Sequence, residues 1–85
     1  MKRIVEEISG EGLEALLGER ITIFAANYIY TGILAGVNDS CVLLTTAAIV
    51  YETGPFDDSK WQDAQDLPDQ WYVQIGAIES FGKMK

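Results

Sequence analysis

Histidine is absent from this 85-residue sequence, and its absence narrows the catalytic chemistry open to the chain. Histidine is the commonest general base and metal ligand in proteins. The single cysteine, Cys41, opens the apolar run 41–44, where a thiol is expected to pack as a small hydrophobic side chain. A serine or cysteine nucleophile would lack its usual activating base. The sequence therefore predicts a protein that is not an enzyme.

Carboxylates offer a second kind of chemistry, because Ca²⁺ and Mg²⁺ prefer oxygen ligands. The polar segment 54–70 holds five aspartates, which are Asp57, Asp58, Asp63, Asp66 and Asp69. Their spacing differs from the Asp-x-Asp-x-Asp-Gly pattern of a calcium loop. We expect a solvent-exposed acidic loop, with a helical turn near residues 61–64 and with no metal or other cofactor.

A polar triplet, Asn38, Asp39 and Ser40, interrupts the apolar stretch 32–44. Asparagine and aspartate side chains accept hydrogen bonds from nearby backbone amides and so favour turns. The same oxygens could instead contact a ligand. The pattern alone leaves both roles open.

Strands are the elements that must position these residues. Alternation and β-branched residues predict strands over 20–26, 29–37, 41–53, 71–75 and 77–81. Gly32 and Gly36 lie inside the second strand, where glycine tolerates a tight curl of the sheet. A short helix is expected only at about 10–17, where the leucines fall on one helical face and Gly18 follows. These elements predict a small, strongly bent antiparallel barrel in a single domain, 1–85.

The formal charge of −7 constrains location and partners. An acidic protein repels phosphate at long range, and four of the six cations lie near the ends, at Lys2, Arg3, Lys83 and Lys85. If the termini meet, these four would form a local basic patch. No stretch reaches the roughly 18 apolar residues that span a bilayer. We expect a cytoplasmic protein without membrane contact.

The order of these elements resembles the Sm-like (LSm, Hfq-like) family, of which this chain would be a divergent member. Gly32, Leu34, Val37 and Leu44 match the first family motif, with Asn38 in place of its aspartate, and Gly76 matches the glycine of the second motif. The resemblance implies a mostly β fold, in which a short N-terminal helix precedes a strongly bent five-stranded antiparallel Sm-like (SH3-like) barrel.

The resemblance also implies a homo-oligomeric ring of about five to seven subunits, in which the fourth strand of one subunit pairs with the fifth strand of the next. Exposed strand edges favour such association on physical grounds. The candidate interface or core residues are Trp71, Tyr72, Ile75, Ile78 and Phe81.

Family members bind single-stranded RNA through two turns, and only some of the family's RNA-binding residues are present in this chain. Val42 stands where the family has its motif asparagine, and Ile75 stands where it has its arginine. The candidate RNA-binding residues are Asn38, Asp39, Ser40 and Gly76 at the turns, with Phe24, Tyr28 and Tyr30 as base-stacking aromatics on another face. Two hypotheses follow: a ring that binds RNA with altered residues, or a ring-forming interaction module that binds no nucleic acid and whose acidic loop contacts a basic protein.

Overall fold

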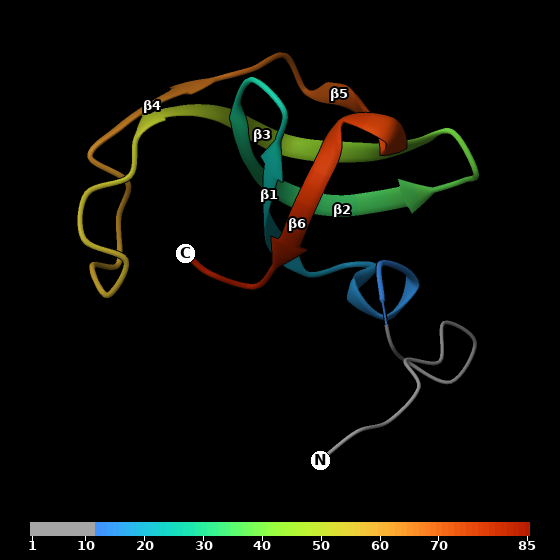
Figure 1. The fold of residues 1–85 in the computed structure, drawn as a ribbon, viewed down its shortest axis with the longest axis horizontal. Helices are drawn as coiled ribbons and strands as arrows, with labels where there is room; N and C mark the ends of the chain where they lie inside the picture. Colours follow the sequence, from blue (N-terminus) through green and yellow to red (C-terminus); the bar gives the residue numbers. More distant parts are fainter. Residues whose placement is uncertain (1–11) are drawn as a thin grey trace.

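The computed structural model describes residues 12–85, which form one antiparallel sheet of six strands (Figure 1). The strands are β1 Arg20–Ala25, β2 Ile29–Val37, β3 Cys41–Glu52, β4 Asp63–Asp66, β5 Gln70–Gln74 and β6 Ile78–Gly82. Their order is β4-β3-β2-β1-β6, and β5 also pairs with β3. The prediction of a mostly β, antiparallel fold is confirmed. The predicted five-stranded barrel is wrong in detail, because the sheet formed by residues 12–85 has six strands and does not close.

The additional strand comes from the segment predicted to be an acidic loop. Residues 63–66 form β4, which pairs with β3 in the register Ala48↔Asp66 and Val50↔Ala64. The helical turn expected near residues 61–64 is therefore wrong. The side chains of β4 are all exposed, as the acidic composition of the segment indicated.

The predicted helix at 10–17 is also wrong within the described residues. Only a 3-10 turn, η1 Glu14–Leu16, forms there, while residues 10 and 11 lie outside the described part. Gly12 and Gly18 both have positive φ, at 81° and 86°, and a left-handed residue cannot continue a right-handed helix. The five residues between them leave room for one short turn. A second 3-10 turn, η2 Ile75–Ala77, connects β5 to β6.

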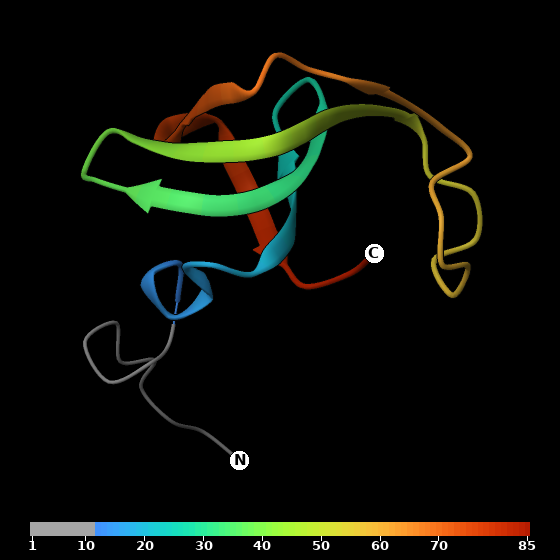
Figure 2. The same cartoon turned by 180° about the vertical axis from the view of Figure 1, so that it is seen from behind.

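The sheet bends sharply at one place along β3, which we call the β3 bend and define as Thr46 and Ala47. Residues 41–45 of β3 pair with β5, and residues 48–52 pair with β4. The register with β2 shifts here by one extra residue on β3, because Thr46 has a φ of 49°. Such a bulge turns the strand and increases its twist. Figure 2 shows the long, curved pair β2–β3 with β1 and β6 crossing it steeply.

Gly32 lies in β2 opposite the β3 bend. A Cβ atom there would lie 3.1 Å from Ala47 Cα and 3.1 Å from the Thr45 carbonyl oxygen. The expectation that Gly32 marks a tight curl is therefore confirmed. Gly36 also adjoins a register shift between β2 and β3, but a Cβ there would make ordinary contact with Leu43 at 3.6 Å.

The core lies inside the curved sheet and is entirely aliphatic. Its members are Ile21, Ile23, Leu34, Val42, Leu44, Ala47 and Val73. Partly buried residues from η1, β5, η2 and β6 pack against it, so the bent sheet encloses its apolar face without closing. Between residues 12 and 85 no helix is long and apolar enough to cross a membrane.

Candidate functional site

The turn between β2 and β3 is held by the side chain of Asn38. Its Oδ1 accepts hydrogen bonds from the backbone N–H of Ser40 at 2.8 Å and of Cys41 at 2.9 Å. The Ser40 hydroxyl donates to the same oxygen at 3.1 Å. The Asn38 side-chain oxygen and the Ser40 hydroxyl, both from residues predicted as RNA contacts, are thus used to form the turn, which agrees with the alternative role of the triplet.

The same turn touches the junction of β5 and η2, which carries the second predicted RNA-binding segment. The backbone N–H of Ile75 donates to the Ser40 carbonyl at 2.9 Å. The structure therefore brings Asn38, Asp39 and Ser40 close to Ile75 and to the neighbouring Gly76. Gly76 is exposed, and a Cβ added to it would meet no atom within 4 Å, so packing does not require glycine at this position.

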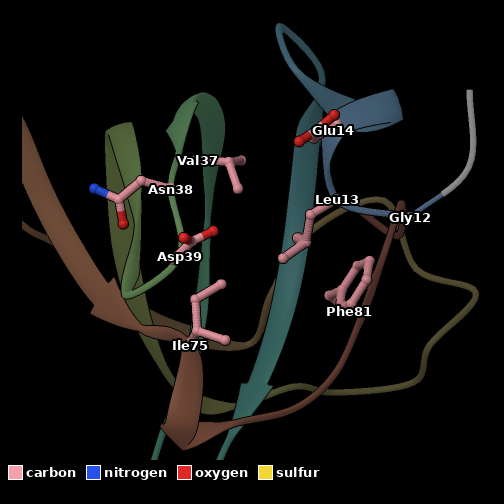
Figure 3. A pocket seen from close by; sticks show the side chains of 8 residues that line it. All are labelled: Gly12, Leu13, Glu14, Val37, Asn38, Asp39, Ile75 and Phe81. Atoms are coloured by element: carbon pink, nitrogen blue, oxygen red, sulfur yellow. The ribbon is translucent and has the colours of Figure 1, made fainter. Parts of the chain in front are cut away.

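A cavity of about 430 Å³ opens beside this turn, and we call it the turn pocket (Figure 3). It is lined by Gly12, Leu13, Glu14, Val37, Asn38, Asp39, Ile75 and Phe81. Figure 3 shows the Asp39 side chain directed toward Leu13, while the amide of Asn38 points away from the other labelled side chains. Sequence reasoning did not assign Leu13 or Glu14 to a site, because no local pattern indicates that the segment before β1 lies against the turn.

The charges around the turn pocket are negative. The described residues that line it include two carboxylates, Glu14 and Asp39. None of these lining residues is a lysine or an arginine. Lys83 instead makes an ion pair with Glu19 at 3.0 Å. A pocket with this lining lacks the cations that normally meet phosphate or base carbonyls in RNA recognition.

The ammonium group of Lys85 is held by the segment that follows β3. This group donates to the carbonyl oxygens of Thr53 at 2.8 Å, Pro55 at 2.7 Å and Lys60 at 3.2 Å. The same group lies 4.7 Å from the centre of the Trp61 ring. The expected basic patch stays a prediction for Lys2 and Arg3, which lie outside the described residues.

A second surface carries three tyrosine rings, and we call it the tyrosine face, defined by the exposed Tyr28 and Tyr51 and the partly buried Tyr30. The rings of Tyr28 and Tyr30 lie 6.3 Å apart in an edge-to-face arrangement. Partial burial raises the pKa of the Tyr30 hydroxyl, and the nearby hydroxyls of Tyr28 and Tyr51 raise that pKa further. Tyr51 was not predicted to lie on this surface. It follows Val50 near the end of β3, and this end of β3 pairs with the start of β2.

Two shallow grooves flank Tyr28 and carry no charged side chain. One, of about 260 Å³, runs between the β1–β2 turn and β5 and is also lined by Tyr30, Trp71 and Tyr72. The other, of about 330 Å³, reaches Val50 and Tyr51. Uncharged aromatic surface is therefore continuous across this part of an otherwise acidic protein.

Phe24 does not belong to the tyrosine face. Ile23 pairs with Tyr30 across β1 and β2, and Phe24 pairs with Ile29. Directly paired residues share a face and consecutive residues point to opposite faces. Phe24 therefore points away from Tyr30, and the structure does not bring these two predicted stacking residues together.

The predicted interface residues divide into two groups. Trp71, Ile75 and Ile78 are partly buried and pack against the core. Tyr72 on β5 is 61% exposed and Phe81 on β6 is 39% exposed. These two rings lie on strands that, among residues 12–85, each pair on one side only, β5 with β3 and β6 with β1.

The aspartates of segment 54–70 are spread along an exposed surface. Asp63 and Asp66 lie on β4, with Asp57, Asp58 and Asp69 in the flanking turns. Within residues 12–85, no three acidic or cysteine side chains are grouped closely enough to hold a metal ion.

Comparisons with protein-family models, with curated proteins and with solved structures found no match to this chain.

Proposed function

We propose that this chain is the subunit of a closed Sm-like ring, of about five to seven copies, that serves as an assembly and protein-interaction module. The observation that carries the proposal is the character of the sheet edges. Strands β5 and β6 each lack a second strand partner among residues 12–85, and each exposes an aromatic ring, Tyr72 or Phe81.

The three edge strands of the sheet differ in charge. The sequence of β4 is DAQD, and charged side chains protect an edge from pairing with another chain. The sequence of β5 is QWYVQ and holds no charge, while IESFG of β6 holds one, Glu79. An uncharged edge favours strand addition. Since β5 and β6 are different strands, pairing β5 of one copy with β6 of the next is head-to-tail, and a repeated head-to-tail contact forms a ring when its rotation closes.

Substitution of Tyr72 by lysine tests the ring. We expect the unmodified chain to have the mass of several subunits in native mass spectrometry and in sedimentation equilibrium. Tyr72→Lys places a charge on the β5 edge and removes an exposed aromatic contact, so the dissociation constant of the assembly should rise about 30-fold, as for a typical interface hot spot.

Tyr51→Lys is the matched control, because Tyr51 is similarly exposed, at 55%, but lies on β3 inside the sheet. It should leave the mass unchanged. A monomeric unmodified chain at micromolar concentration, or equal effects of the two substitutions, would contradict the proposal.

Binding of single-stranded RNA is a second candidate function, favoured by the tyrosine face alone. Exposed tyrosines can stack on bases at about 1–3 kcal/mol per base without a cation. In low salt, we expect the fluorescence anisotropy of a labelled oligoadenylate to increase when the protein binds it. Tyr28→Ala should weaken the affinity for this oligonucleotide at least about fivefold. Phe56→Ala, which removes a similarly exposed ring (60% against 50% for Tyr28) from the loop after β3, should not weaken binding. If neither oligoadenylate nor oligouridylate binds in dilute buffer, the chain binds no RNA.

A further inference from the structure

We infer that the turn pocket binds an arginine side chain presented by a basic segment of a partner protein. The inference goes beyond ring assembly, because it assigns a ligand to a hollow beside the β2–β3 turn, of whose lining residues Phe81 also lies on the β6 edge. Its volume of about 430 Å³ lies within the range of roughly 300–1,000 Å³ typical of ligand pockets.

The walls of the turn pocket suit an aliphatic stem. Leu13 precedes η1, Val37 ends β2, Ile75 begins η2 and Phe81 lies on β6. These apolar side chains come from four separate segments and surround one hollow (Figure 3). The three methylene groups of an arginine side chain bury their apolar surface well against such a wall.

The carboxylates of the pocket select a cation. Glu14 and Asp39 are both exposed side chains in its lining, and they belong to different segments, η1 and the β2–β3 turn. An anionic group would meet two like charges there, within a protein of net charge −7. Charge complementarity therefore favours a cationic group with an apolar stem.

Phe81 and the geometry of the turn favour arginine over lysine. The Phe81 ring is 39% exposed, and a guanidinium group can stack on an aromatic face while its N–H groups donate to a carboxylate of the same lining. Lysine carries a compact charge that loses more hydration in such a site. The three hydrogen bonds to Asn38 Oδ1 hold the turn that carries Asp39, so this carboxylate is positioned before the ligand arrives.

Solution NMR of the full ¹⁵N-labelled chain tests the inference. The probe is the capped peptide acetyl-Leu-Arg-Leu-amide, and the comparison peptide carries citrulline, an uncharged isostere, in place of arginine. We expect the arginine peptide to shift the amide signals of Asp39, Ile75 and Phe81, with a dissociation constant that rises with salt. The citrulline peptide should bind at least about fivefold more weakly.

Two substitutions with the same change of charge separate the pocket from the general acidity of the protein. Asp39→Asn should weaken binding of the arginine peptide about fivefold or more, whereas Asp58→Asn, at an exposed position outside the pocket, should not. Unchanged amide spectra outside the turn verify that each variant is folded.

Equal binding of the two peptides, equal losses in the two variants, shifts confined to other surfaces, or no shift at millimolar peptide would each overturn the inference. Seating of a second copy in the pocket would also overturn it, and would appear as a shift of the Asp39 amide on increasing protein concentration without peptide, whereas ring assembly shifts the amide of the β6 edge residue Phe81. The mass of the assembly, measured in the same samples, reports separately on the ring.

Discussion

Gly32→Ala is expected to lower the free energy of unfolding by about 2 kcal/mol, because it overpacks the inside of the β3 bend. The added Cβ would lie 3.1 Å from Ala47 Cα and 3.1 Å from the Thr45 carbonyl oxygen. Both are backbone atoms of β3, so no side chain can rotate to make room. Relief would require β2 and β3 to move apart where the bulge at Thr46 fixes their register.

Gly36→Ala is the matched control for this substitution. Both glycines lie in β2 beside a register shift, but a Cβ at Gly36 approaches Leu43 Cβ no closer than 3.6 Å. We expect its free energy of unfolding to stay within about 0.5 kcal/mol of the original or to rise slightly, since alanine restricts the unfolded chain. Urea denaturation followed by tryptophan fluorescence measures both variants. Equal stability of the two would show that the close approach at Gly32 is not what shapes the sheet.

Val42→Asn is expected to cost about 3 kcal/mol or more of unfolding free energy. The Sm-like resemblance places the family's motif asparagine at this position. Here Val42 is fully buried within the aliphatic core and pairs with Val73 across β3 and β5. A buried amide without hydrogen-bond partners would therefore replace an apolar contact.

Val42→Ala separates the loss of packing from the burial of a polar group. Removing two methyl groups should cost about 2 kcal/mol, counting both transfer and cavity. The comparison uses the same urea denaturation. If asparagine is no worse than alanine at this position, its side chain has reached solvent or a partner, and the strand can present it as a base contact. The expected order, in which asparagine is worse, means that this position of β3 does not present an asparagine side chain to a base.

The strand pattern of the sequence predicted most of the sheet because the chemistry involved is local. Ile21 and Ile23 are fully buried, and β-branched residues within the first strand indicated an extended chain. Gly32 indicated a curl because a missing side chain permits close approach of backbones. The predicted bounds of β2 agree with the observed strand, Ile29–Val37.

The errors arose where tertiary contacts override local preference. The leucines at 13, 16 and 17 have helical spacing, yet the left-handed glycines on either side reduce the segment to η1. Residues 63–66 have poor strand propensity, and they form β4 because β3 is long enough to supply a second pairing partner beyond its bend.

The candidate site was predicted in part. The β2–β3 turn and the β5–η2 junction were both named as candidate RNA-binding segments, and the hydrogen bond between Ile75 N–H and the Ser40 carbonyl joins them. The involvement of Glu14 could not be predicted, because it depends on how the chain before β1 crosses the end of the sheet. The separation of Phe24 from Tyr30 follows from strand register, which short sequence patterns do not specify.

The β3 bend affects how the domain tolerates insertions and deletions in the connection after β3. The bend divides β3 into two parts. Among the described residues, one part pairs with β5 and the other with β4, and no residue of β3 pairs with both. A longer or shorter connection between Glu52 and Gln70 alters the distal half of β3 and the Lys85 contacts with this segment. Evolution can therefore remodel that end of the domain, as an appendage, while the scaffold around Ser40 and Ile75 keeps its shape.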